Sequence, residues 1–132
     1  MPEAGFPQKL RLSNAAEFNA VFSNVEYKSS SRQLVMFALG NRLSYPRLGL
    51  VVGKKNVPLA VDRNRVKRIL RASFRQNQQL LVGLDIVILA RNELGAVTNK
   101  WLHDTSMRMW QDLCNKHARK PTQLTVPAVS KQ

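Results

Sequence analysis

The chain has 132 residues, of which 21 are Lys or Arg and 8 are Asp or Glu, so its formal net charge at pH 7 is +13. This balance is typical of proteins that bind nucleic acid or an anionic membrane surface, and a hydrophobic content of 44% indicates a folded basic protein rather than a chain disordered throughout. Cys114 is the only cysteine, which excludes an intrachain disulfide and favours a reducing compartment. Because residues 1–12 lack the apolar run of a signal peptide and no stretch approaches the roughly 20 apolar residues of a membrane span, we expect one folded cytoplasmic domain.

The first elements in chain order are an arm and a short helix. Residues 1–12 contain two prolines and are expected to form an extended N-terminal arm. Ser13 or Asn14 can cap a helix that runs to about Ser23. Glu17 stands three residues after Asn14, which is the capping-box position.

Two strand-like runs follow, at residues 33–39 and 48–54, and the Gly- and Pro-containing loop between them predicts an antiparallel hairpin. A weaker strand precedes them near residues 26–31. The clearest strand, residues 84–91, is an almost unbroken run of Ile, Val and Leu, which is typical of a strand buried on both faces. A helix separates it from the second run, so strand, helix and strand predict a parallel crossover.

The second run carries small side chains on one face. Alternation places Gly49, Val51, Gly53 and Lys55 together, and glycine weakens a strand unless something must approach it closely. Two interpretations stay open. Either a ligand approaches this face, with Lys55 closing it, or a helix packs tightly onto the glycines.

The most informative segment is the helix predicted from about residue 59 to residue 78. Its central residues, 63–75, carry six cations and no carboxylate. At about 100° per residue, one arc of roughly 140° collects Arg63, Asn64, Lys67, Arg68, Arg71 and Arg75. Most of the opposite side is apolar: Val66, Ile69, Leu70 and Phe74. Like charges four positions apart repel unless an anion is bound, and arginine matches phosphate oxygens, so this face predicts phosphate binding rather than an ordinary solvated surface.

Asn99 can cap a last helix, whose apolar stripe consists of Leu102, Met109, Trp110, Leu113, Cys114 and His117. Core packing explains Cys114 and His117 better than a zinc site, because a fourth ligand and the usual paired spacings are missing. Residues 119–132 are expected to form a disordered basic tail, which leaves residues 13–118 as the folded domain. The predicted fold is a single α+β domain in the order αβββαβα.

The sequence offers no catalytic constellation. Its eight carboxylates are scattered, without a pair spaced for acid–base work or for a two-metal site. Neither GxxxxGK[ST] nor GxGxxG occurs, and no serine stands in a GxSxG elbow. Neither catalytic residues nor metal ligands are therefore predicted, and binding remains as the function.

Several motifs together strongly resemble the protein subunit of bacterial ribonuclease P. The most specific of them are Lys54-Lys55-Asn56, Arg63-Asn64-Arg65-Val66-Lys67-Arg68, Arg71 and Phe74. The resemblance extends from about residue 10 to residue 117, with Pro46-Arg47-Leu48-Gly49-Leu50 and Asp85-Ile86-Val87-Ile88 among the corroborating pieces. Ala72 departs from the pattern, since many members carry an acidic residue there.

The resemblance implies a sandwich fold shared with the second domain of a ribosomal protein, with an unusual left-handed βαβ crossover. It implies a ribonucleoprotein endoribonuclease, composed of an RNA subunit and this protein, that removes the 5′ leader from precursor tRNA. The RNA subunit would carry the active site and bind the catalytic Mg²⁺, so the protein alone would be inactive and would act by raising substrate and metal affinity. The implied partners are that RNA subunit and precursor tRNA, with neither a membrane nor a small-molecule substrate.

The resemblance also assigns roles to residues. Contact with the catalytic RNA is implied for Arg63, Asn64, Arg65, Lys67, Arg68, Arg71 and Arg75. The 5′-leader cleft is implied for Phe18, Phe22, Phe37, Lys54 and Lys55. Aromatic platforms beside cations suit single-stranded RNA, although core packing remains the alternative for Phe18 and Phe22.

A second class of function shares these sequence features. A structural rRNA-binding protein of the ribosomal type would have the same size, charge and lack of an active site, and no role in catalysis. Co-purification with ribosomal subunits after a high-salt wash would favour this alternative.

Overall fold

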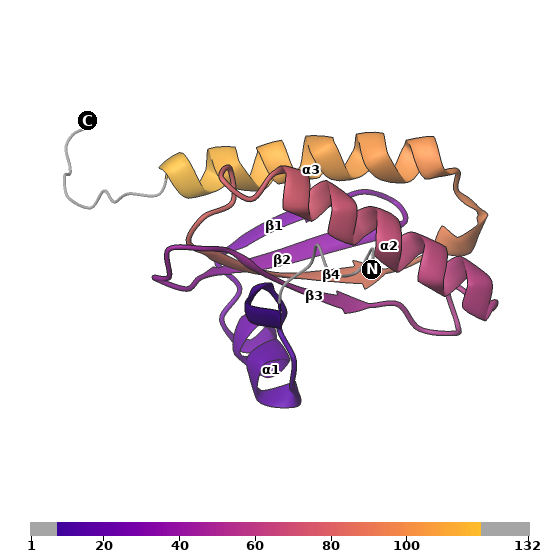
Figure 1. Cartoon of the computed structure of the whole chain (residues 1–132), viewed down its shortest axis with the longest axis horizontal. Coiled ribbons are helices and arrows are strands. Elements are labelled where there is room, and N and C mark those ends of the chain that lie inside the picture. The colour runs from indigo at the N-terminus through magenta and orange to yellow at the C-terminus, as the bar shows by residue number, and fades with distance from the viewer. Residues whose placement is uncertain (1–7, 120–132) are drawn as a thin grey trace.

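A computed structural model describes residues 8–119, which form one mixed β-sheet with helices on both of its faces (Figure 1). The strands are β1 (Tyr27–Ser30), β2 (Leu34–Gly40), β3 (Arg47–Val51) and β4 (Leu84–Ala90). The helices are α1 (Ala15–Ser23), α2 (Ala60–Gln76) and α3 (Asn99–Arg119), with short 3₁₀ turns η2 (Gln8–Leu10) and η3 (Leu94–Ala96). This order confirms the predicted α+β class.

The strand order across the sheet is β1-β2-β4-β3. Strand β4 pairs antiparallel with β2 and parallel with β3, so β3, α2 and β4 form the predicted parallel crossover. The predicted hairpin of residues 33–39 with residues 48–54 is wrong, because β4 lies between these two strands. The reason is burial: β4 is the most apolar strand, and the middle of the sheet covers both of its faces.

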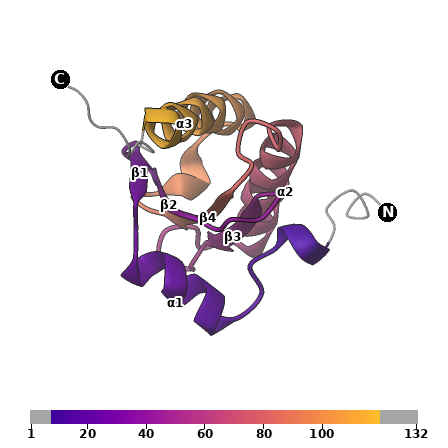
Figure 2. The same ribbon diagram turned by 90° about the vertical axis from the view of Figure 1, so that its left-hand side faces the viewer.

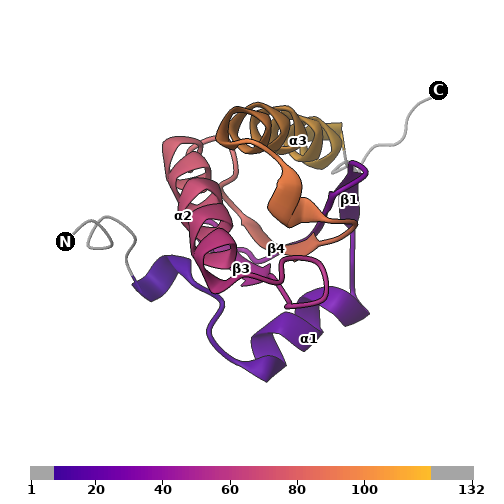
Figure 3. The same cartoon turned by 90° about the vertical axis from the view of Figure 1, so that its right-hand side faces the viewer.

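The sheet separates two layers of helix. Figures 2 and 3 show α2 and α3 together on one face and α1 alone on the other. The larger core lies between the sheet and the α2–α3 pair, and its fully buried members include Met36, Leu70, Phe74, Ile86 and Trp110. The smaller core lies under α1 and consists of Leu12, Val21 and Val87, with Phe18, Phe37, Leu39 and Val51 packed against it.

Residues 8–12 do not form the extended arm that we expected. Residues Gln8–Leu10 make a 3₁₀ turn, and Arg11 then bridges Leu48 in parallel at the outer edge of β3. The Leu12 N–H donates to the Leu48 carbonyl at 3.0 Å, and the side chains of Leu10 and Leu12 are buried. Burial of these two leucines holds the segment against the sheet. Residues 1–7 of the predicted arm lie outside the described residues.

The helix ends agree in part with the prediction. Asn14 caps α1 by accepting from the Glu17 N–H at 2.9 Å, as the capping box predicts. The Glu17 carboxylate accepts from the N–H of Ser13 at 2.6 Å, one residue before the N-cap, where a capping box would have it accept from Asn14. The last helix is capped by Thr98 instead of Asn99, because the Thr98 hydroxyl accepts from the Trp101 N–H at 3.0 Å. Helix α3 continues to Arg119, and residues 120–132 of the predicted tail lie outside the described residues.

Candidate nucleic-acid interface

Helix α2 is amphipathic in the way that its sequence predicts. Val66, Leu70 and Phe74 are fully buried, and every one of them packs into the larger core. The opposite side exposes Asn64, Arg68 and Arg75, with Lys67 and Arg71 half-buried beside them. Because only one side of the helix is needed for packing, the cationic side is left to meet solvent or a partner.

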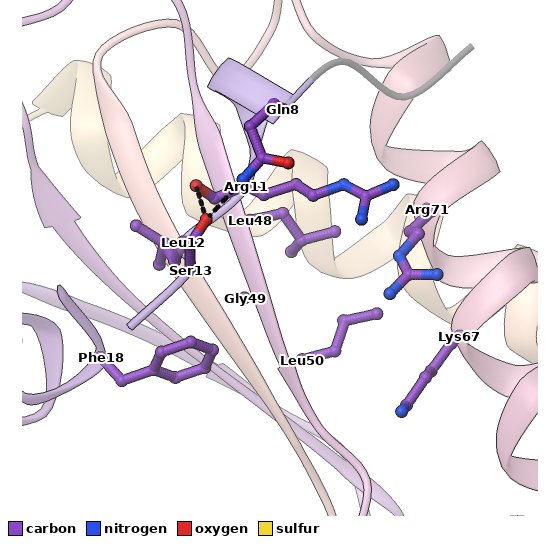
Figure 4. A pocket seen from close by; sticks show the side chains of 10 residues that line it. All are labelled: Gln8, Arg11, Leu12, Ser13, Phe18, Leu48, Gly49, Leu50, Lys67 and Arg71. Carbon is purple, nitrogen blue, oxygen red and sulfur yellow. Dashed lines mark hydrogen bonds between the residues drawn. The ribbon is translucent and has the colours of Figure 1, made fainter. Parts of the chain in front are cut away.

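A cleft of about 300 Å³ lies between this cationic side, β3 and the segment of residues 8–13. Figure 4 shows the side chains of Arg11, Lys67 and Arg71 reaching into it from two sides. A second hollow continues from it over α2 and is lined by Arg11, Asn64, Lys67, Arg68 and Arg71. Among the described residues 8–119, those that line the two hollows include four cations and no Asp or Glu, which favours an anionic ligand there.

Arg11 was missed by the sequence analysis. It belongs to a segment far from α2 in the chain, and its approach to Arg71 depends on the bridge between Arg11 and Leu48. The available signal was weak: Arg11 is one of two cations that precede α1, and no local pattern places it beside α2.

Two arginines of α2 are turned toward neighbouring loops instead of the cleft. Arg63 Nη1 donates to the carbonyls of Val57 and Pro58, each at 2.9 Å. Arg65 donates to the Gly95 carbonyl at 3.1 Å and to Asn99 Oδ1 at 2.6 Å. The structure therefore brings together four of the seven helix residues assigned to RNA contact: Asn64, Lys67, Arg68 and Arg71. Arg75 is exposed farther along α2, where it lines a separate hollow with Gln78 and Gln111.

The small-residue face of β3 divides into a covered part and an open part. A Cβ added to Gly49 would lie 2.6 Å from Cζ of Phe18, so α1 packs tightly onto this glycine. A Cβ added to Gly53 would meet nothing within 4 Å, and the adjacent Lys54 and Lys55 are exposed. Helix packing thus explains Gly49, whereas the end of the run that carries the lysine pair is accessible to a ligand.

The aromatic residues assigned to the leader cleft lie along the α1 face of the sheet. Phe22 is 41% exposed, and its ring meets that of Phe37 edge-on with centroids 5.7 Å apart. Lys28 Nζ lies 5.9 Å from the centroid of Phe37, a contact that the sequence analysis did not find. Phe18 is half-buried: its ring packs against the smaller core and also lines the cleft beside α2. Phe22 and Phe37 with Lys28 therefore form the accessible aromatic surface.

An ion-pair network fixes α1 against this face. Arg47 forms a bidentate ion pair with Asp85: Nε donates to Oδ1 at 2.9 Å, and Nη2 donates to Oδ2 at 2.7 Å. Its Nη1 donates to Glu17 Oε2 at 3.2 Å. The hydrogen bond to Asp85 raises the pKa of the Arg47 guanidinium, against the opposing effect of burial. Because Glu17 also caps α1, this network sets where Phe18 and Phe22 stand over the sheet.

Within residues 8–119, no three side chains of His, Cys, Asp or Glu gather where they could hold a metal ion. His117 packs edge-on against Tyr27, with its Nδ1 3.0 Å from the Tyr27 hydroxyl, so it belongs to the contact between α3 and β1. In the same range, no helix combines the length and the apolarity that a membrane span requires.

The fold and this surface define a class of protein: a small α+β domain that presents a cationic helix, a cation-lined cleft and an aromatic sheet face to a polyanion. Residues 6–114 match the family model described as Ribonuclease P. The chain belongs to the ribonuclease P protein family.

The relatives agree with the family model over most of the chain. The ribonuclease P protein component of Pseudomonas aeruginosa is 42% identical over 98% of this chain and 96% of that protein. The corresponding protein of Pseudomonas putida strain KT2440 is 47% identical over 95% of this chain and 89% of that protein.

Solved structures support the same assignment. The RNase P protein of Staphylococcus aureus superposes with a TM-score of 0.71 at 25% identity, over 78% of this chain and 94% of that one. The RNase P protein of Thermotoga maritima gives a TM-score of 0.68 at 27% identity, over 77% and 96%. The predicted function, the protein component of ribonuclease P, is confirmed, and an RNA partner in a ribonucleoprotein follows from it. The ribosomal alternative is not favoured.

Proposed function

We propose that the specific partners of this ribonuclease P protein are the ribonuclease P RNA subunit and precursor tRNA, and that the 5′ leader of the precursor is removed in their complex. The observation that carries this proposal is the cleft in which Arg11, Lys67 and Arg71 converge. Guanidinium and ammonium groups gathered in one cleft can bind several phosphate oxygens at once, so the cleft suits a folded RNA backbone.

The two surfaces serve different RNA strands in this proposal. The cationic side of α2, with Asn64, Lys67, Arg68 and Arg71, contacts the RNA subunit together with Arg11, and Arg75 extends this contact along the helix. The aromatic surface of Phe22 and Phe37, together with Lys54 and Lys55 in the loop after β3, binds the single-stranded leader. Flat rings accept unstacked bases of any sequence, and the lysines bind the phosphate backbone.

The chemistry is assigned to the RNA subunit. The carboxylates of residues 8–119 are dispersed and several are already engaged, as Asp85 is by Arg47, so the donor set does not suit a metal centre of the protein's own. Catalytic Mg²⁺ would therefore be held by RNA phosphates and positioned with the protein's help. The reaction would take place in the cytoplasm, where precursor tRNA is made.

Cleavage of a precursor tRNA tests the proposal. Three reactions at low Mg²⁺ compare ribonuclease P RNA alone, the protein alone, and both together, with release of the 5′ leader as the readout. We expect cleavage in the mixture and none with the protein alone. A folded protein that adds nothing to the activity of the RNA would overturn the proposal, and its retention on ribosomal subunits after a high-salt wash would then support the ribosomal alternative.

A further inference from the structure

The turn η3 lies between two cationic regions: the cationic side of α2, and the loop after β3 that carries Lys54 and Lys55. On one side, Arg65 of α2 donates to the Gly95 carbonyl and to Asn99 Oδ1, and its Nε lies 3.7 Å from Asp62. The Arg65 side chain is only 21% exposed. Its hydrogen bonds join the first turns of α2, the turn η3 and the start of α3 into one assembly.

The loop with the lysine pair contacts the same turn from the other side. The Gly95 N–H points to the Asn56 carbonyl at 3.4 Å, while Asn56 Nδ2 donates to the Ala90 carbonyl at 3.1 Å. A Cβ on Gly95 would lie 3.3 Å from Cγ1 of Val57, so turn and loop are in close contact. The peptide groups of Gly95 thus connect the lysine loop to Arg65.

We propose that Arg65 is a positioning residue: it holds the lysine pair and the cationic side of α2 in one fixed relation by binding Gly95 and Asn99, and it makes no RNA contact of its own. The proposal rests on the proposed function, because RNA is the ligand that both parts would meet. Two features support it. The donors of Arg65 are directed at protein acceptors, and Arg65 is absent from the lining of both cationic hollows.

Asn99→Ala isolates this role, because it removes an acceptor of Arg65 without changing the charge of the protein. Asn99→Asp is the conservative variant, since a carboxylate can still accept from Arg65. Arg68→Ala is the comparator for loss of a direct phosphate contact. Ser73→Ala is the control for stability alone, because Ser73 is buried between α2 and α3, away from the cationic hollows.

Two affinities are measured for each full-length variant. The first is the affinity of the protein for ribonuclease P RNA, at several KCl concentrations. The second is the affinity of the assembled complex for a precursor tRNA that carries its 5′ leader. All measurements are made at a temperature at which circular dichroism shows each variant to be folded. We expect Asn99→Ala and Arg65→Ala to weaken both affinities by about five- to tenfold, a loss of the size expected for one ordinary hydrogen bond. Neither variant is expected to change the slope of log affinity against log salt.

The comparators define the alternatives. Asn99→Asp should restore both affinities, Ser73→Ala should leave both unchanged, and Arg68→Ala should reduce the magnitude of the salt slope by about 0.7–0.9, the value for one lost phosphate contact. If Arg65→Ala changes the slope as Arg68→Ala does while Asn99→Ala has no effect, Arg65 contacts RNA and the inference is overturned. Wild-type protein that binds no RNA would instead refute the proposed function.

Discussion

At the scale of single residues, Gly49 determines how α1 meets the sheet. We expect Gly49→Ala to destabilise the fold by about 1–3 kcal/mol, because the new methyl group would displace the Phe18 ring from its place over β3. Urea unfolding of the two proteins measures the difference. The loss should shrink in a Phe18→Leu background, where the side chain can move aside, and an equal loss in both backgrounds would contradict this account.

Phe18 and Phe22 are expected to respond differently to truncation. Phe22→Ala should weaken binding of a leader-containing precursor by about 1–3 kcal/mol, the contribution of one stacked base, and change the unfolding free energy little, since the ring is 41% exposed. Phe18→Ala should instead lower the unfolding free energy, because its ring packs on Gly49 and the smaller core. Leader affinity and thermal unfolding of both variants separate the roles, and equal effects on leader affinity would count against this division.

The sequence could not distinguish these two phenylalanines. They stand four residues apart on the same helix edge, and either could be the buried one. What separates them is the sheet register, which places Phe37 and Gly49 on either side of Val87. Phe22 meets the ring of Phe37, whereas Phe18 fills the space over Gly49. Such a pairing depends on strand order, which local patterns do not contain.

At the scale of elements, a buried hydrogen-bond network joins α2 to α3. Ser73 Oγ accepts from Trp110 Nε1 at 2.8 Å and lies 2.8 Å from Ser106 Oγ, and all three side chains are buried. We expect Ser73→Ala to cost about 1–3 kcal/mol of unfolding free energy, since the Trp110 N–H would lose its partner inside the core. Chemical denaturation tests the value, and a variant as stable as the wild type would show that the indole finds another acceptor.

The elements themselves were largely predictable from sequence, and their arrangement was not. The amphipathic pattern of α2, the Asn14 cap of α1 and the apolar run of β4 are local signals, and the structure confirms each of them. The expected hairpin failed because adjacency in sequence favours pairing of β2 with β3, whereas burial of β4 on both faces requires it between them. The burial of β4 between distant strands outweighs the tendency of strands that are consecutive in the sequence to pair with each other.

At the scale of the whole molecule, the net charge of +13 makes binding depend on salt. If six to ten phosphates are neutralised, affinity for ribonuclease P RNA should fall by about three to five decades between 50 and 200 mM salt, because each contact releases counterions. Filter binding or fluorescence titration over this range measures the slope. An affinity that does not change with salt would exclude the electrostatic account of the cationic cleft.

The position of β4 also decides when a growing chain can fold. Strand β3 has β4 as its strand neighbour, and the residues of β4 leave the ribosome after those of α2. Until then, Val66, Leu70 and Phe74 lack the residues of β4 and α3 that complete the larger core, while the adjacent arginines have already been synthesised. Pairing of β4 with β2 and β3 is therefore a late step of folding. It joins segments that are distant in the sequence, and contacts of this kind are typical of proteins that fold slowly. During synthesis, we therefore expect the cations proposed to bind the partner RNA to be accessible to other RNA as well.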